Sequence, residues 1–183
     1  MTEYLYPKDE YRYYGGGKLL KHMMLPAPDE LRFIKAFRKS QYYYNRNKLL
    51  WLWWELRKRK ISRRTHIQIQ TSTKIGAGFY IGHCGRIIIN PKAILGKNIN
   101  ISTGVTIGQT NRGEREGTPI IGDNVWIGTN AVIVGKITIG TDVMIAPNAY
   151  VNFDVPSHSI VIGNPATILP RENATVGYIN RTI

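Results

Sequence analysis

Aliphatic residues recur every six positions through most of the chain. The spacing joins Ile69, Ile75 and Ile81, then Ile89, Leu95, Ile101 and Ile107, and finally Ile121, Ile127, Ile133, Ile139, Ile145 and Val151. Four positions after each member of the last set stands another apolar residue: Val125, Ala131, Ile137, Val143, Ala149 and Val155. Residues six positions apart do not fall on one face of an α-helix, whose period is about 3.6 residues, so a helix would distribute these side chains around its whole surface. The pattern therefore predicts short strands joined by tight turns.

Three such hexads, about 18 residues, would form one triangular coil, and stacked coils would bury the repeated aliphatics inside a parallel β-helix. A glycine follows many of the repeat positions: Gly76, Gly82, Gly96, Gly108, Gly122, Gly128 and Gly140. Glycine suits close-packed turns because it has no Cβ. A β-sandwich would instead show strict alternation with turns every 8–12 residues. The pattern favours the β-helix.

The repeat slips by two residues at two places. The first slip lies between Ile81 and Ile89, around GHCGRII, and the second lies between Ile107 and Ile121, where the polar segment 109–119 is inserted. Loops that interrupt a repeat usually lie on its functional face. We therefore expect segment 109–119 to help enclose a functional site, in preference to a passive insertion.

The N-terminal third has a different composition. Residues 1–66 hold 16 of the 25 Lys and Arg, 6 of the 12 Asp and Glu, and 3 of the 18 glycines. We expect a basic, aromatic N-terminal region over 1–66, a β-helix domain over 67–170 with its loop at 109–119, and a C-terminal tail over 171–183.

Two helices are predicted in the N-terminal region. One begins at Asp29, in DELRFIKAFRKS, and the other runs from about Tyr42 to Lys60. The second contains LLWLWW, a run too continuous for one face, so we expect it to be covered on more than one side, by the first coil or by another subunit. The alternative is interfacial membrane binding, because RKRKISRR follows the Trp and Leu residues. The segment before Asp29 is expected to be an irregular arm.

Composition excludes several classes of protein. No apolar run approaches the 18 or so residues of a spanning helix, and the start shows no secretory signal, so we expect a cytoplasmic protein, with contact at the inner face of the membrane left open. A single cysteine, Cys84, excludes an internal disulfide. The net charge of +13 raises the question of nucleic acid. Because the charge is concentrated before residue 67 and no binding motif is present, a nucleic-acid partner is disfavoured.

The motifs IGHCGRIIINPKAILGKNINISTGVTIG, IIGDNVWIGTNAVIVGKITIG and IVIGNPATIL carry a family resemblance. Over about residues 67–170 the chain resembles the hexapeptide-repeat acyltransferases, specifically the serine acetyltransferase branch and related polysaccharide O-acetyltransferases. The resemblance implies a left-handed parallel β-helix and a homotrimer. It also implies acetyl-CoA as a co-substrate in the cleft between neighbouring subunits, with no permanently bound cofactor and no metal.

His83 is the candidate catalytic residue. It occupies the first slip, where a change of register can lift a side chain out of the regular wall. An imidazole is the usual group for taking a proton from a hydroxyl near neutral pH, so we expect His83 to be the general base for attack on the acetyl-CoA thioester. The alternative is an ordinary turn residue. Adjacent strand side chains face opposite ways, so we assign Cys84 to packing and not to a Cys–His pair.

The resemblance also implies contacts to acetyl-CoA. It places Thr129 at the pantetheine arm and the backbone around Ala146 and Pro147 one coil further along. The exit motif beginning at Gly163 lacks the Lys or Arg that usually follows it and meets the nucleotide phosphate, because Thr167 stands there. Lys136 and Arg171 are the candidates to replace that cation, with solvated surface charges as the alternative reading.

The chain departs from the serine acetyltransferase pattern at two site positions. Gln68 stands where that family has a carboxylate partner for the His, and Thr118 stands near its second site His. From these departures we expect an acetyl-CoA-dependent O-acetyltransferase acting on a sugar hydroxyl in capsular, exopolysaccharide or lipopolysaccharide assembly. Serine O-acetylation in cysteine biosynthesis is the alternative, and a noncatalytic β-helix scaffold stays open.

Overall fold

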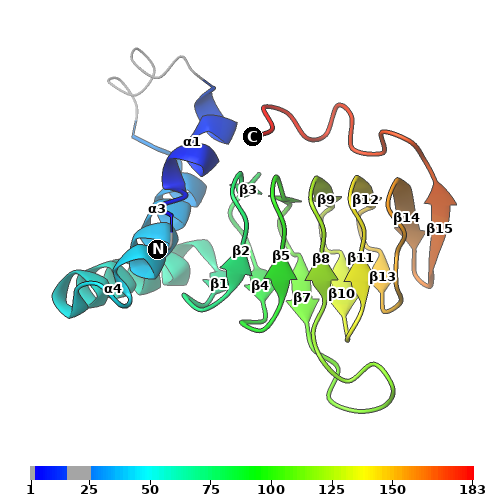
Figure 1. The fold of residues 1–183 in the computed structure, drawn as a ribbon, viewed down its shortest axis with the longest axis horizontal. Helices are drawn as coiled ribbons and strands as arrows, with labels where there is room; N and C mark the ends of the chain where they lie inside the picture. Colours follow the sequence, from blue (N-terminus) through cyan, green and yellow to red (C-terminus); the bar gives the residue numbers. More distant parts are fainter. Residues whose placement is uncertain (1–2, 16–25) are drawn as a thin grey trace.

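The computed structural model describes residues 3–15 and 26–183. Its described helices are α1 (Tyr6–Tyr14), α3 (Asp29–Tyr43) and α4 (Lys48–Thr65), and they lie together at one end of a stack of short strands (Figure 1). Among these residues no helix combines the length and apolar character needed to cross a membrane.

The strands form three sheets, which we call faces A, B and C. Face A contains β1 (Ile67–Ile69), β4 (Ile87–Ile89), β7 (Thr106–Gly108), β10 (Val132–Val134) and β13 (Tyr150–Val151). Face B contains β2 (Lys74–Ile75), β5 (Ile94–Leu95), β8 (Ile120–Ile121) and β11 (Thr138–Ile139). Face C contains β3 (Tyr80–Ile81), β6 (Asn100–Ile101), β9 (Val125–Ile127), β12 (Val143–Ile145), β14 (Ser159–Gly163) and β15 (Ala166–Pro170). The chain visits the faces in the order A, B, C, and like strands of successive coils pair in parallel, so the predicted parallel β-helix is confirmed.

The repeat aliphatics form the core. Every one of the thirteen residues in the three hexad sets is buried, and Ile81, Ile107, Ile127, Ile133, Ile145 and Val151 are fully inaccessible. Strand pairing places Ile69, Ile89, Ile107, Ile133 and Val151 in one column on face A. Each fully buried Ile contributes roughly 1.5–3 kcal/mol of transfer free energy. Column stacking of the repeat is therefore the main source of cohesion in this half of the chain.

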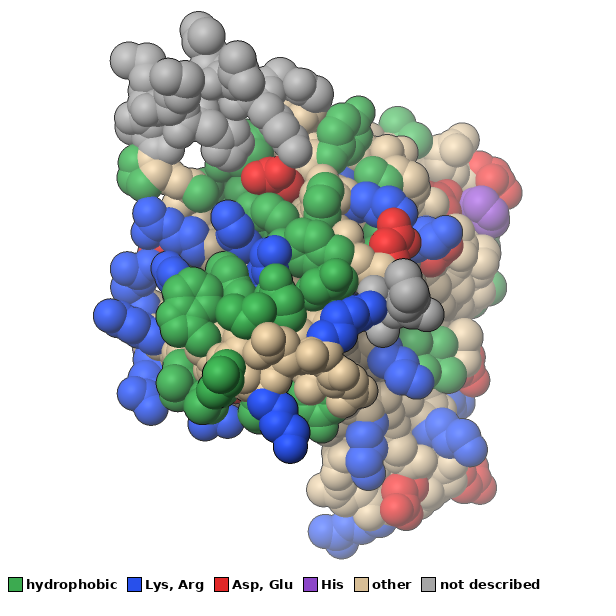
Figure 2. Space-filling model, turned by 60° about the vertical axis from the view of Figure 1, so that its left-hand side comes forward, with side chains coloured by type: hydrophobic (Ala, Val, Ile, Leu, Met, Phe, Trp, Pro, Cys, Tyr) green, Lys and Arg blue, Asp and Glu red, His purple; other side chains and the backbone are tan. Residues whose placement is uncertain are grey.

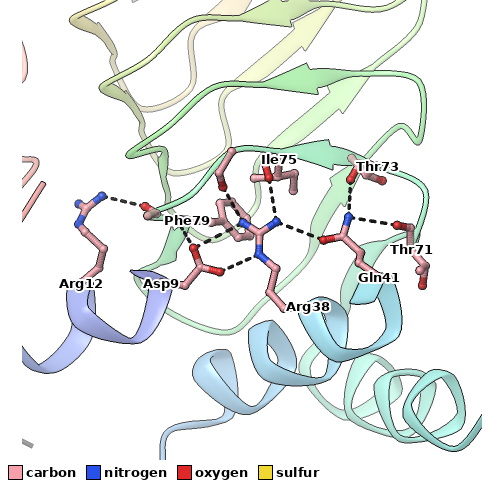
Figure 3. Close-up of polar contacts among 10 residues, drawn as sticks. Asp9, Arg12, Arg38, Gln41, Thr71, Thr73, Ile75 and Phe79 are labelled. Carbon is pink, nitrogen blue, oxygen red and sulfur yellow. Dashed lines mark hydrogen bonds and ion pairs between the residues drawn. The ribbon is translucent and has the colours of Figure 1, made fainter. Parts of the chain in front are cut away.

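The helices close the open end of the β-helix. The first coil has no preceding coil to pair with, so some of its backbone groups need other partners. Arg38, from α3, donates to the carbonyl oxygens of Ile75 at 2.8 Å and Gly76 at 2.6 Å. Asp9, from α1, accepts from the backbone amide of Phe79 at 2.8 Å, and Arg38 Nε donates to Asp9 Oδ2 at 2.7 Å (Figure 3). Gln41 donates in the same way to the carbonyl oxygens of Thr71 and Thr73.

Helix α1 corrects the expectation of an irregular arm before Asp29. Nine residues are too few for an independently stable helix. The missing stability comes from long-range contacts: Asp9 is fully buried, and Arg12 donates to the carbonyl oxygen of Gly78 at 2.8 Å. The Gly16, Gly17 and Lys18 part of the expected arm lies outside the described residues.

Helix α4 differs from its prediction at its start. It begins at Lys48 and not near Tyr42, because the Asn47 side chain caps it by accepting from the Leu50 amide at 3.0 Å. Within one chain α4 is covered on one side only, and coverage of its other side by another subunit stays a prediction. Its buried residues are Glu55, Lys58 and Thr65, which take the polar contacts to the first coil, and the leucines point outward.

The C-terminal tail, residues 171–183, returns along the β-helix toward α1 (Figure 1). Asp142 anchors its start by accepting from the Thr175 amide at 3.0 Å and the Thr175 hydroxyl at 2.7 Å. Asn100 Nδ2 donates to the Tyr178 carbonyl at 3.0 Å, and Arg12 Nε donates to the Asn180 carbonyl at 2.8 Å. The tail therefore links the last coils to the helical end.

Candidate active site

His83 lies in the bend between β3 and β4, at the corner where face C turns into face A. Its side chain is exposed and makes no hydrogen bond or ion pair with any residue that the structure describes. The slip of the repeat adds two residues to this corner, and the exposed His83 is one of the residues in the bend that they form. The imidazole is thus open to a ligand.

Three backbone contacts fix the bend. Gly82 N donates to the Ile101 carbonyl at 3.0 Å in the next coil, and Gly85 N donates to the Thr65 carbonyl at 3.0 Å at the end of α4. Cys84 N donates to Glu30 Oε1 at 2.6 Å, at the start of α3. Gly85 has φ +150°, and a Cβ there would overlap Thr103, so only glycine fits. Helices from the N-terminal region therefore position the bend that carries His83.

Cys84 packs against the core and is partly buried. Burial, with an added contribution from the nearby Glu30 carboxylate, raises the pKa of the Cys84 thiol to about 12. A thiol with that pKa carries almost no thiolate at neutral pH. These properties support the packing assignment and argue against a Cys–His pair.

The later C-to-A corners stack on the corner of His83. Ser102 N donates to the Ile127 carbonyl at 3.0 Å, Gly128 N to the Ile145 carbonyl at 2.8 Å, and Ala146 N to the Val161 carbonyl at 2.8 Å. Asn148 N also donates to the Thr129 carbonyl at 2.9 Å. We call this column of stacked C-to-A corners the His83 edge, because His83 lies at its first corner. Four residues expected to contact acetyl-CoA lie on the same edge: Thr129, Ala146, Pro147 and Gly163. At about 4.8 Å per strand, the four steps from the His83 coil to the Gly163 coil span roughly 19 Å, a length suited to an extended ligand.

Lys136 lies elsewhere. It follows β10 at the corner where face A turns into face B, and its amide donates to the Arg115 carbonyl at 2.9 Å. A cavity of about 410 Å³ separates loop 109–119 from face B, and Lys136, Arg115 and Thr118 line it. Arg171 is also off the edge, because its amide donates to the His158 carbonyl at 2.7 Å, at the start of β14 and so at the opposite end of that strand from Gly163. Neither candidate cation shares an edge with His83 within one chain.

Within the described residues, neither of the two departures from the family pattern makes a hydrogen bond to His83. Gln68 is an exposed residue of face A. Thr118 Oγ1 donates to the Lys92 carbonyl at 3.2 Å at the A-to-B corner. A groove of about 1410 Å³ between the helices and faces A and B includes Gln68 but not His83. Sequence reasoning missed Glu30 as a residue of this site, because an acid at a helix start is expected for the helix dipole alone.

Comparisons with known proteins agree on one family. The family described as "Bacterial transferase hexapeptide (six repeats)" matches residues 118–152. Serine acetyltransferase 2 of Arabidopsis thaliana is 35% identical over 137 residues, which cover 74% of this chain and 42% of that protein. The serine acetyltransferase of Staphylococcus aureus strain N315 is 37% identical over 113 residues, 62% of this chain and 53% of that protein. The chain thus spans about half the length of these curated relatives.

Solved structures give the same result. The serine acetyltransferase of Neisseria gonorrhoeae superposes with a TM-score of 0.73 at 30% identity, covering 92% of this chain and 65% of that one. The serine acetyltransferase of Brucella abortus in complex with coenzyme A has a TM-score of 0.75 at 23% identity, covering 92% and 67%, and shows the fold alone. The chain is therefore a hexapeptide-repeat protein of the acyltransferase type. Within that class it is similar to the serine acetyltransferase branch, as its motifs indicated.

The same comparisons overturn the expected sugar acceptor. The relatives and structures named above are serine acetyltransferases, so the assignment to polysaccharide assembly is wrong and the serine alternative is the better supported one. The inference had relied on Gln68 and Thr118, which report only that a carboxylate and an imidazole are absent at two positions. Neutral hydrogen-bonding side chains do not select a sugar over an amino acid, so their presence carried no positive evidence.

Proposed function

We propose that the protein is an acetyl-CoA-dependent O-acetyltransferase whose acceptor is the hydroxyl group of serine. The observation that carries the proposal is the shared edge, in which His83 stands at one end and Thr129, Pro147 and Gly163 follow coil by coil. The names of the relatives support serine as the acceptor.

The chemistry follows from an exposed imidazole beside an extended ligand. His83 takes the proton of the serine hydroxyl as the oxygen attacks the thioester carbonyl of acetyl-CoA. The tetrahedral intermediate collapses with cleavage of the carbon–sulfur bond, the acetyl group stays on the serine oxygen, and the coenzyme A thiolate receives the proton from His83. Edge backbone and side chains hold the co-substrate so that its thioester lies at the His83 end.

A homotrimer completes the site in this proposal. One chain offers the His83 edge, whereas Lys136 and loop 109–119 lie at a different corner, so a neighbouring subunit must supply the cation and the enclosing loop. Light scattering is expected to give three times the 20.8 kDa chain mass, about 62 kDa. A monomer with full transferase activity would remove the argument for a site shared between subunits.

The experiment measures coenzyme A thiol release from acetyl-CoA with L-serine. His83→Ala is expected to lower kcat by roughly 10²–10⁴-fold with little change in acetyl-CoA affinity, because only proton transfer is lost. Cys84→Ala is the matched control, since it alters the next residue of the same bend, and its kcat should stay near that of the parent. Transfer to serine at the parent rate in a folded His83→Ala trimer would disprove the role of His83. Absence of serine acetylation by the parent protein would disprove the acceptor.

A further inference from the structure

Helix α4 presents an apolar stripe to the outside of the molecule. Leu49, Leu52, Trp53 and Leu56 occupy positions i, i+3, i+4 and i+7, which fall on one side of a helix. Their exposed fractions are 81%, 48%, 47% and 55%. The side that packs on the first coil holds Glu55, Lys58 and Thr65. The polarity of α4 is therefore the reverse of that expected for a helix whose only partner is its own domain.

Cations continue the same stripe. Lys60 and Arg63 follow on the outward side in the last two turns, and both are exposed. Neither makes an ion pair with a residue in the described part of the chain. Other basic residues of the helix are engaged: Arg59 pairs with Glu55 at 3.2 Å and Arg64 with Asp29 at 2.5 Å. The outward face of this 18-residue helix, about 27 Å long, is thus apolar in its first half and cationic in its second.

The charge of this face selects its partner. Helix α4 carries seven Lys and Arg residues and one Glu, and that Glu is buried. Figure 2 shows hydrophobic side chains gathered at the helical end of the molecule, with Lys and Arg side chains around them. The same face of a second copy would bring its own seven Lys and Arg toward these cations. A surface with dense negative charge above an apolar layer matches both halves of the stripe.

We propose that the outward face of α4 binds the surface of an anionic phospholipid bilayer. The three leucines and Trp53 enter at headgroup depth, and Lys60 and Arg63 lie against lipid phosphates. Arg57, 4.8 Å from the Trp53 ring centroid, adds a cation beside the aromatic ring. The helix lies in the interface and does not span it. This binding is independent of acetyl transfer, so either proposal can fail without the other.

The test is flotation of the full chain with vesicles of phosphatidylcholine containing 30% phosphatidylglycerol. We expect the protein to bind these vesicles. The binding should weaken in high salt, and it should be weak with vesicles of pure phosphatidylcholine. The variant Leu49→Gln/Leu52→Gln/Leu56→Gln should lose at least about 10-fold in vesicle affinity, and Lys60→Gln/Arg63→Gln should lose on the order of 10-fold. Brominated lipids should quench the tryptophan fluorescence of the parent protein, and less so in Trp53→Phe.

Matched controls lie on the β-helix. Ile120 and Leu169, at 50% and 51%, are about as exposed as Leu52 and Leu56 of α4, and Ile120→Gln/Leu169→Gln should leave vesicle binding unchanged. Lys92→Gln/Lys97→Gln removes two exposed cations and should have a smaller effect than the α4 pair. Failure of the parent protein to float, or equal binding by the leucine variant and the parent, would overturn the proposal. So would a leucine variant that still binds vesicles but has a smaller mass in light scattering, because the face would then be an interface between copies.

Discussion

The Glu30 carboxylate accepts a hydrogen bond of 2.6 Å from the backbone amide of Cys84, the residue that follows His83. The contact joins residues 54 positions apart and connects the start of α3 to the bend of the candidate base. A hydrogen bond from an amide to a carboxylate is charge-assisted and is about twice as strong as a hydrogen bond between neutral groups. We infer that Glu30 is a positioning residue for His83, although it does not touch the imidazole.

Loss of the hydrogen bond between Glu30 and Cys84 should lower the turnover number more than it weakens acetyl-CoA binding. Glu30→Ala is expected to lower kcat for acetyl transfer by roughly 10-fold, the effect of about 1.4 kcal/mol, with the KM for acetyl-CoA unchanged. Glu30→Gln keeps an oxygen acceptor and should restore most of the rate. If Glu30→Gln is as slow as Glu30→Ala, or if KM rises in place of a fall in kcat, the positioning role is wrong.

The effect of the Glu30 carboxylate should also be measurable as a change in the pKa of the neighbouring Cys84 thiol. Burial is the larger cause of the raised Cys84 pKa, and Glu30 adds to it, so Glu30→Gln should lower that pKa from about 12. Alkylation of Cys84 by iodoacetamide reports the thiolate fraction, and its midpoint should shift to lower pH in the variant. The denatured protein gives the reference rate. An unchanged midpoint would mean that burial alone sets the value.

Much of the fold could be predicted because its signal is local. The six-residue period places Ile127 or Ile133 in the core without knowledge of any distant residue, and the slip between Ile81 and Ile89 marks the corner of His83. Helix α1 could not be predicted, since its stability depends on the buried Asp9 and Arg38, which lie 29 positions apart. The role of Glu30 is hidden for the same reason. The acceptor was predicted wrongly because absent side chains at two positions do not identify a ligand.

Substitution of Gly128 tests how closely the stacked corners of the His83 edge are packed. A Cβ at this position would lie 2.6 Å from Pro147 N and 2.9 Å from the Ile145 carbonyl oxygen, both backbone atoms of the next coil. Gly128→Ala is therefore expected to destabilise the protein by about 1–3 kcal/mol and to weaken coenzyme A binding, because the corner carrying Thr129 must move. Gly82→Ala is the control for stability, since its Cβ would meet nothing closer than 3.9 Å. Thermal denaturation and calorimetric titration measure the two effects, and equal stability of both variants would contradict the close packing described for this edge.

The buried pair of Asp9 and Arg38 should contribute strongly to stability. Their side chains are 0% and 2% exposed, so Arg38→Met leaves a buried carboxylate without its cation and removes two bonds to first-coil carbonyls. The expected cost is about 3–5 kcal/mol in the free energy of unfolding by urea, measured at fixed protein concentration. Arg32→Met is the control, because the Arg32 pair with Asp29 is exposed and 3.4 Å long, and should cost under about 1 kcal/mol. Similar losses in the two variants would contradict the view that helix side chains close the first coil.

Glu55 predicts a specific loss of stability in acid. Burial alone would raise its pKa, but hydrogen bonds from Thr71, Lys58 and Ser40 outweigh burial and lower the pKa from 4.5 to about 2. Because the folded value lies below the unfolded one, the unfolded chain binds more protons between pH 4.5 and 2, and the stabilisation present above pH 4.5 is lost as the pH falls through this window. The difference corresponds to roughly 3 kcal/mol. In Glu55→Gln this contribution is absent at every pH, whereas the other carboxylates titrate as before. The unfolding free energy of the parent minus that of the variant, measured by urea denaturation from pH 6 to pH 2, should therefore decrease as the pH falls. Parallel profiles over that range would show that the contacts around Glu55 do not hold its charge in the folded state.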